Sequence, residues 1–166
     1  GTLGATTDAS SSLITLNQLA VDGAFTLAPH GTGAVTIVND AGLDLALSTM
    51  GGTFSGTATT GDISDRGTLT ITQAATFITT ASGRSIILDE PDSVFTSTVT
   101  MQAGNGSNAV FDNITFVDSA AVKLHSSAAS AGDLYINATG LAVGGNLSIT
   151  ATTGDITHGA AVTVTG

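Results

Sequence analysis

Carboxylates are the side chains of this sequence whose spacing could support chemistry. The segment 89–92 reads DEPD and is the densest charged cluster in the chain. Its Asp89, Glu90 and Asp92 offer the oxygen ligands that Ca²⁺ prefers, so they are the candidate metal ligands. No motif in the sequence requires a cofactor, and calcium is the only cofactor for which it offers candidate ligands.

A second acidic group consists of Asp62 and Asp65, with Arg66 beside them. Carboxylates next to a cation are the groups with which glycosidases and lyases act. The histidines stand alone, and no HExxH or comparable metal-binding spacing occurs among them. They are His30, His125 and His158. We therefore expect no catalytic residues; a carbohydrate-active or glycan-binding protein with an acidic groove is the alternative.

The charge balance limits the kinds of partner that this protein could bind. The formal net charge is −10, with only three Lys and Arg residues. Nucleic-acid backbones and anionic membrane surfaces both require clustered cations, so neither is an expected partner. The chain has no cysteine, which excludes disulfides and cysteine-based zinc sites. It also has no run of about 18 apolar residues, so no membrane insertion is expected.

The heptad TATTGDI occurs twice, at residues 57–63 and 150–156. The flanks align without a gap: residues 51–72 read GGTFSGTATTGDISDRGTLTIT, and residues 144–165 read GGNLSITATTGDITHGAAVTVT. Apolar positions stay apolar in both copies, on both sides of the heptad. Internal repetition of this kind is typical of solenoids, in which each repeat packs on its neighbours.

Apolar and polar residues alternate along most of the chain, which is the pattern of half-buried strands. Gly, Asn, Asp and Ser, which favour turns, separate these segments. The candidate strands lie at residues 13–16, 24–28, 34–38, 43–47, 67–72, 75–79, 84–88, 93–101, 108–117, 121–125, 133–137, 145–150 and 161–165. The sequence therefore predicts an all-β fold, a parallel β-helix with coils of about 18–24 residues.

In such a solenoid the heptad forms a corner. Its glycine lets the chain turn, its aspartate accepts hydrogen bonds from backbone N–H groups, and its isoleucine points inward to stack in a column. We expect both copies to lie on the same face, ~19–24 Å apart along the axis. The structural residues of the repeat are Gly61, Asp62, Ile63, Gly154, Asp155 and Ile156.

The whole chain, residues 1–166, is expected to be one solenoid segment of a longer repetitive protein, with residues 1–12 as a loosely held terminus. Threonines recur with period two at 68–72, 96–100 and 163–165. Side chains with this period share one face of a strand, so a Thr-rich face that binds ice or glycans is a further alternative.

The coils GNLSITATTGDI and GAAVTVTG, within residues 144–166, resemble the repeat region of filamentous haemagglutinin-like exoproteins. Residues 51–72 share this resemblance with more divergence. These exoproteins are large bacterial surface adhesins, often exported by two-partner secretion. The resemblance implies a right-handed parallel β-helix, secretion, and a role as a shaft or adhesive segment.

The expected function is therefore that of a structural and adhesive shaft segment of a secreted protein at the bacterial cell surface. Since a solenoid without caps has an unpaired coil at each end, the expected partners are other copies or flanking coils, joined end to end and able to build fibres. Glycans or proteins of a host or a neighbouring cell are the other expected partners.

Overall fold

The structure is a computed structural model of residues 1–166, and it describes all of them except 105–112, 126–132, 137–140, 160 and 165–166. The side chains of 125, 133–136 and 141–142 are likewise not described. The described residues form strands, turns and bends without any helix, so none of their segments meets the requirements for a membrane-spanning helix.

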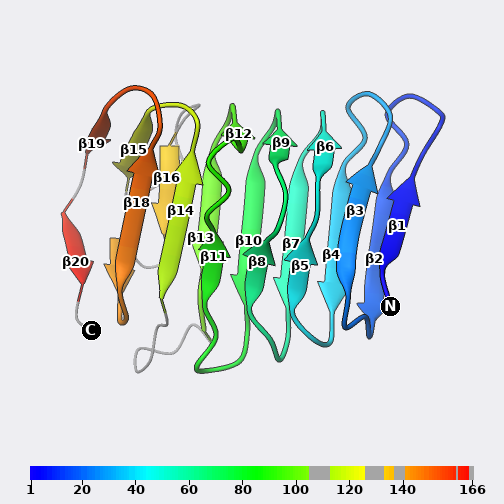
Figure 1. Ribbon diagram of the computed structural model, residues 1–166, viewed down its shortest axis with the longest axis horizontal. Helices are drawn as coiled ribbons and strands as arrows, with labels where there is room; N and C mark the ends of the chain where they lie inside the picture. The colour runs from blue at the N-terminus through cyan, green and yellow to red at the C-terminus, as the bar shows by residue number, and fades with distance from the viewer. Residues whose placement is uncertain (105–112, 126–132, 137–140, 160, 165–166) are drawn as a thin grey trace.

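Two large sheets of parallel strands face each other across the core (Figure 1). The sheet nearer the viewer in Figure 1, called the front sheet, has seven strands whose order follows the chain. They are β1 (Leu3–Thr6), β3 (Ala24–Ala28), β5 (Leu43–Leu45), β8 (Ile63–Asp65), β11 (Ile86–Leu88), β14 (Ile114–Asp118) and β18 (Leu147–Ala151).

The other large sheet, called the back sheet, has eight strands. In spatial order they are β2 (Ile14–Leu19), β4 (Val35–Asn39), β7 (Phe54–Ala58), β10 (Ala75–Thr79), β13 (Val99–Gln102), β16 (Asp133–Ile136), β15 (Val122–His125) and β19 (Ile156–His158). β16 thus lies between β13 and β15, out of chain order. This irregularity adjoins the long coils of the C-terminal half.

Short strands lie between the large sheets. A three-stranded top sheet consists of β6 (Ser48–Met50), β9 (Leu69–Ile71) and β12 (Val94–Phe95). A further parallel pair consists of β17 (Leu141–Val143) and β20 (Val162–Val164). All strand pairings among the described residues are parallel, and none of them joins two arms of an antiparallel hairpin.

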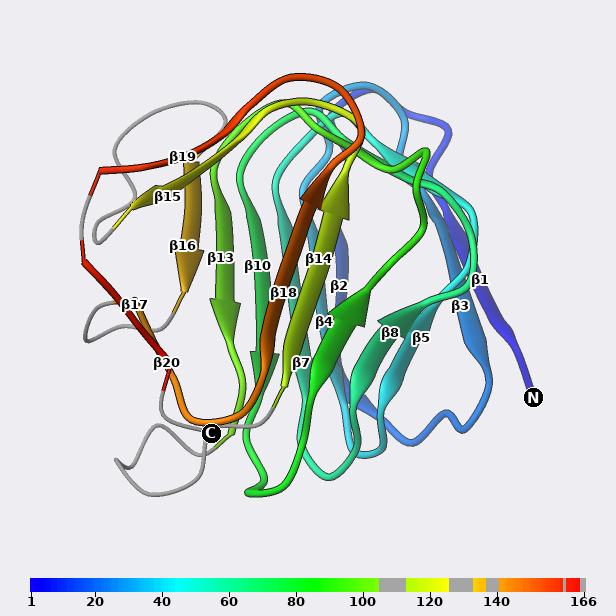
Figure 2. The same ribbon diagram turned by 60° about the vertical axis from the view of Figure 1, so that its left-hand side comes forward.

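The chain winds as a right-handed solenoid, which confirms the predicted fold class. Figures 1 and 2 show front strands running upward and back strands running downward while the chain advances from the N-terminal to the C-terminal end. Along the front sheet the register partner advances 20 residues from Leu43 to Ile63, then 23 to Ile86, 28 to Ile114 and 33 to Leu147. The early coils fit the predicted length, whereas the later ones exceed it.

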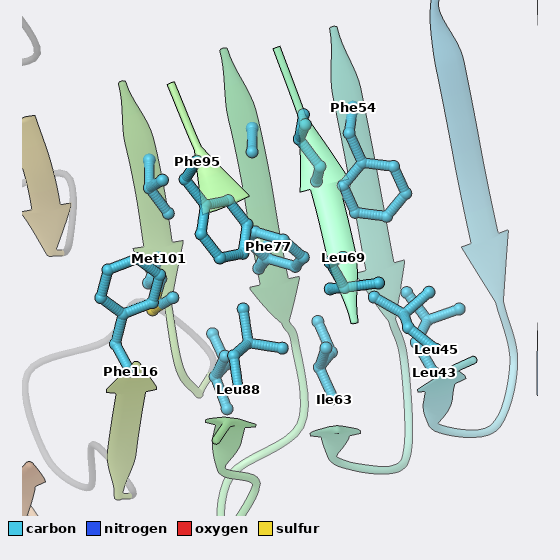
Figure 3. Packing of buried hydrophobic residues seen from close by; sticks show 14 of the residues in the cluster. Leu43, Leu45, Phe54, Ile63, Leu69, Phe77, Leu88, Phe95, Met101 and Phe116 are labelled. Carbon is cyan, nitrogen blue, oxygen red and sulfur yellow. The ribbon is translucent and has the colours of Figure 1, made fainter. Parts of the chain in front are cut away.

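Inward side chains fill the core because strand residues alternate between buried and partly exposed positions, as in β4, β7 and β10. Four phenylalanines form a stack across successive coils (Figure 3). The ring centroids are 5.1 Å apart for Phe54 and Phe77, 6.2 Å for Phe77 and Phe95, and 5.1 Å for Phe95 and Phe116. Such aromatic pairs add stability beyond area burial alone.

Two sequence predictions about strands were wrong. Residues 3–6, in the segment expected to be loose, form β1 and pair with β3. The predicted strand 93–101 is divided into β12 and β13, because the coil turns a corner between them. At this corner the Thr96 hydroxyl donates to the Thr72 carbonyl of the preceding coil at 2.8 Å. Thr suits a strand and a corner equally well, so the alternating pattern did not reveal the break.

Candidate functional site

The first heptad forms the corner between the back sheet and the front sheet, from β7 to β8. The Thr59 amide donates to the Asn39 carbonyl at 3.0 Å, and the Thr60 hydroxyl donates to the Asp40 carbonyl. Farther along, the Leu43 amide donates to the Asp62 carbonyl at 2.9 Å. The corner therefore rests on the corner of the preceding coil through a short series of hydrogen bonds.

The second heptad makes the same contacts in the opposite sheets. It leads from β18 in the front sheet to β19 in the back sheet. Thr152 N donates to the Asp118 carbonyl at 2.9 Å, the Thr153 hydroxyl donates to the Ser119 carbonyl, and Val122 N donates to the Asp155 carbonyl at 3.0 Å. The hydrogen-bond partners match those of the first copy one for one.

The expectation that the two copies share a face was therefore wrong. Each copy joins the same two sheets, but in opposite order, so the copies differ by about half a coil. The physical reason is that the coils between them lengthen from 23 to 33 residues in the front-sheet register. Both kinds of corner present the same backbone groups, so one heptad fits either corner.

The glycines of the two heptads are required for different reasons. A Cβ on Gly61 would lie 2.4 Å from the backbone N of Gly42, a contact that side chains do not make. Gly154 instead has a φ of 89°, in the left-handed region that favours glycine. Both glycines permit the corner.

The aspartate of the first heptad accepts a hydrogen bond from the following coil. Its Oδ1 accepts from the Ser85 amide at 2.9 Å, so Asp62 binds a backbone N–H group as expected, but across coils rather than within its own turn. The Asp155 side chain is exposed, and no hydrogen bond to its carboxylate occurs within the described part of the chain.

The isoleucines of the two heptads differ in how far they are buried. Ile63 is fully buried between Leu43 and Ile86 in the front sheet, in a column of inward side chains. Ile156 pairs with Val122 on one side only and is 49 % exposed. The column is therefore complete at the first copy and open at the second.

The three charged residues near the first heptad diverge rather than form a catalytic group. Asp65 points into the core, and Asp62 bonds to the backbone of the following coil. Arg66 points outward and pairs with Asp44, with its Nε 2.7 Å from Asp44 Oδ1. Asp44 and Asp62 also line a shallow hollow of about 230 Å³ with Asp22. Two of these three carboxylates already have partners.

Asp65 is a buried acidic residue, and its burial was not predicted from the sequence. It pairs with Leu45 in the front sheet, and only 8 % of its surface is exposed. Its Oδ1 accepts from the Asp89 amide at 2.9 Å, whereas its Oδ2 is buried without a partner. Burial is the main cause that raises the pKa of Asp65 to about 6. Hydrogen bonds from the Asp89 and Glu90 amides lower this pKa, and the negative charges of Asp89 and Glu90 raise it.

Other buried polar residues occupy equivalent places at the inward end of a strand. Asn39 ends β4 and bonds to both backbone groups of Val21, at 2.9 and 2.8 Å. Thr79 ends β10 and accepts from the Gly104 amide at 2.8 Å. Asp118 ends β14, accepts from the Phe95 amide at 3.3 Å, and has its pKa raised by burial. The alternating pattern, if extended to the last residue of each strand, would have revealed all four.

The predicted calcium ligands belong to a turn that precedes β12. The Ser93 amide donates to the Glu90 carbonyl at 3.2 Å, and Asp89 contributes its amide to Asp65. No group of three or more acidic or histidine side chains in the described ranges is arranged to hold a metal ion. The structure thus does not bring Asp89, Glu90 and Asp92 together as ligands. His30 and His158 are exposed, and the side chain of His125 lies outside the described residues.

The outer face of the back sheet carries a ladder of hydroxyl groups. Strand register places one Thr or Ser of each coil beside the next, in the order Thr15, Thr36, Ser55, Thr76 and Thr100. The neighbouring row is mixed and contains Val38, Thr57, Ile78 and Gln102. The predicted threonine run 96–100 is divided by the corner between β12 and β13, and of the run 68–72 only Thr70 lies within a strand. The run 163–165 ends at a residue outside the described ones.

Comparison with known proteins agrees with the repetitive architecture. Residues 32–102 match a family described as repeats of unknown function (DUF5649). This stretch extends from β4 to the end of β13, where the coils are most regular. No curated protein and no solved structure matches the chain. The chain is a repeat protein with a β-solenoid fold, and part of it is similar to repeats whose function is not known.

Proposed function

We propose that this chain is a structural and adhesive shaft segment of a secreted bacterial cell-surface protein. The observation that carries the proposal is the ladder of hydrogen bonds between coils in the described residues. Backbone hydrogen bonds such as Val35 N to Thr53 O (2.9 Å) and Phe54 N to Ala74 O (3.0 Å) join each coil to the next. A column held by backbone pairing and a packed core resists bending without metals or disulfides.

The site geometry is consistent with a structural role. Asp62 of the first heptad and the Arg66–Asp44 pair beside it hold neighbouring coils together, and inward polar side chains such as Asn39 satisfy backbone groups at corners. The resemblance of residues 144–166 to filamentous haemagglutinin-like exoproteins supports secretion and surface exposure. Attachment to glycans or proteins of another cell is part of this proposal.

Antibody labelling of intact cells tests the proposal. Antibodies against the purified chain are expected to label unpermeabilised cells of the source organism, and external protease should remove the signal. A cytoplasmic protein serves as the control, since it should be labelled only after permeabilisation. Labelling of this chain only after permeabilisation would contradict a surface shaft.

The hydroxyl ladder of the back sheet favours a second candidate function, the binding of ice. Its hydroxyl groups recur at the strand spacing of ~4.8 Å on the outer face of the sheet. Thermal hysteresis measures this activity. Thr76→Tyr in the middle of the ladder should abolish it, whereas Thr115→Tyr on the outer face of the front sheet should leave it unchanged. Absence of hysteresis in the unmodified protein would exclude this candidate.

A further inference from the structure

The charged residues of the central coils lie on one half of each coil. From residue 40 to residue 104, every Asp, Glu, Lys and Arg falls in one of three segments, which are 40–46, 59–66 and 80–92. Each of these segments contains the corner that leaves a back strand and the front strand that follows, β5, β8 or β11. No charged side chain occurs in the segments that contain the top strands and back strands, which are 47–58, 67–79 and 93–104.

The outer face of the back sheet is uncharged as a result, and we call it the neutral face. It consists of the outward side chains of β2, β4, β7, β10 and β13, strands that contain no acidic or basic residue. From β4 to β13 its outward side chains are partly exposed. The outer face of the front sheet differs, because it carries the ion pair of Asp44 and Arg66. The neutral face contains the hydroxyl ladder and the row of Val38, Thr57, Ile78 and Gln102.

The charge of the chain restricts how two copies can approach each other. Copies with a net charge of −10 repel, and a contact through the front sheet or the corners would bring carboxylates of both copies together. A contact through the neutral face brings none together in the central coils. The small Thr, Ser, Val and Ile side chains of this face suit two sheets that pack face to face, at a distance of ~10 Å.

We propose that the neutral face binds the neutral face of a second copy, so that two solenoids lie side by side. The same surface is used by both partners, so the pair is closed by a two-fold axis. With this axis parallel to the solenoid axis, each coil faces the corresponding coil of the other copy, because both copies have the same strand spacing. The contact therefore keeps its register as coils are added. The inference rests on the proposed shaft and names the partner that binds its side.

The area of the contact grows with the number of coils. Five strands at ~4.8 Å and five residues at ~3.3 Å give a face of about 24 Å by 16 Å, on the order of 400 Å². A standard stable interface buries about 800 Å² on each partner, so this face alone supports a weak pair. Each further coil adds about 80 Å², and a longer repetitive shaft reaches the standard area after about ten coils.

Chemical cross-linking tests the contact and its symmetry in the full chain, which has no native cysteine. The two-fold axis places Thr76, in the middle of the hydroxyl ladder, near Thr76 of the partner copy. Thr76→Cys should therefore give several times more covalent dimer with a short bismaleimide than Thr115→Cys does. Thr115 is the matched control, because it is the second residue of β14, as Thr76 is of β10, and is also partly exposed. Equal yields would overturn the proposal.

The direction of the partner has its own test. Thr100 lies one strand farther along the hydroxyl ladder, in β13. If each coil faces the corresponding coil, Thr100→Cys should also cross-link to itself, and so should Thr36→Cys in β4. If the two copies instead ran in opposite directions, Thr36→Cys and Thr100→Cys would cross-link with each other and not with themselves. That result would overturn an axis parallel to the solenoid.

Light scattering tests the same face without a reagent. The apparent mass of the unmodified chain should rise from 16.2 kDa towards twice that value with protein concentration, and more strongly in 0.5 M than in about 0.02 M NaCl, since salt screens the repulsion. Thr76→Asp brings two carboxylates together in the pair and should remain monomeric. Thr115→Asp adds the same charge to the front sheet and should still associate in 0.5 M NaCl.

Two results would overturn the side-by-side pair. One is an unmodified chain that stays monomeric at about 1 mM protein in 0.5 M NaCl, a concentration that reveals even weak pairing. The other is association that Thr76→Asp leaves unchanged, because the copies would then meet through another surface. Surface labelling of intact cells decides the shaft proposal separately, since a shaft can stand at the cell surface without a partner at its side.

Discussion

The two copies of TATTGDI have the same sequence and the same contacts with the coil before them, but within the described residues only the first copy is covered by a following coil. Thr59 and Thr152 donate to carbonyls of the preceding coil at 3.0 and 2.9 Å. Ile63 is fully buried, whereas Ile156 is 49 % exposed. One sequence is thus present in a covered and an uncovered state within a single molecule.

This difference teaches that burial in the solenoid depends on the neighbouring coil rather than on the coil's own residues. In a one-dimensional stack, each repeat is stabilised by its own folding and by its interfaces with adjacent repeats. The first copy has two interfaces and the second has one. Comparing substitutions at matched positions of the two copies therefore measures how much the following coil contributes to the free energy of unfolding.

Of the matched pairs, the two isoleucines should differ most in the free energy of unfolding that is lost on substitution by alanine. Ile63→Ala removes a fully buried side chain between Leu43 and Ile86 and should lower the free energy of unfolding by about 2–5 kcal/mol. Ile156→Ala removes a side chain that is half exposed and should cost about 1 kcal/mol or less. Urea denaturation of both variants checks the difference. Equal losses would mean that Ile156 is covered in solution.

Substitution of the two glycines should destabilise different coils of the solenoid. Gly61→Ala brings a Cβ against the backbone of Gly42 and should cost about 1–3 kcal/mol, because two coils must separate. Gly154→Ala forces a residue with a side chain into a φ of 89° and should cost about 1 kcal/mol. Hydrogen exchange should show loss of protection across the central coils for Gly61→Ala and only in the last coil for Gly154→Ala. Uniform loss in both variants would contradict independent coil interfaces.

Much of the fold was predictable because its determinants are local. Alternation placed β3 and β10 at the observed residues, and the repeat indicated a stack of parallel coils. The half-coil offset between the heptads was not predictable, because it depends on coil lengths of 28 and 33 residues in a region without clear repetition. Corners such as 96–98 were also missed, since Thr is compatible with strands and turns.

The candidate site was less predictable because burial depends on register. Asp65 follows Ile63 at a spacing of two, so alternation places it inward, but its charge suggested a solvated corner. Asp62, Asp65 and Arg66 do not form a group, because neighbours in a strand point to opposite faces. Sequence proximity is therefore a poor guide to clustering in a solenoid, where the residue one coil away is the real neighbour.

Asp65 should make stability depend on pH. Its pKa in the folded protein is raised from 3.8 to about 6, so the folded state holds the proton more tightly than the unfolded state. Stability should therefore rise as pH falls from about 6 to 4, by on the order of 1–2 kcal/mol once solvent screening is allowed for. Asp65→Asn should flatten this slope and stabilise the protein at pH 7.5. Urea denaturation at several pH values measures both effects.

The aligned position in the second copy provides the control. His158 matches Asp65 in the repeat but is exposed. His158→Asn should therefore retain the rise in stability between pH 6 and 4. A smaller slope should remain in Asp65→Asn, because burial also raises the pKa of Asp118. An unchanged slope in Asp65→Asn would show that this carboxyl is solvated.

The threonine pair should show the smallest effects and no difference between copies. The hydroxyls of Thr60 and Thr153 donate to Asp40 and Ser119 of the preceding coil, which both copies possess. Substitution of either threonine by valine keeps the shape and removes one hydrogen bond, which should cost about 0.5–1.5 kcal/mol. Because the following coil takes no part in this bond, the two losses should agree to within about 0.5 kcal/mol. If Thr60→Val cost far more than Thr153→Val, the covering coil would strengthen even the contacts that it does not touch, and the coil interfaces would not be independent.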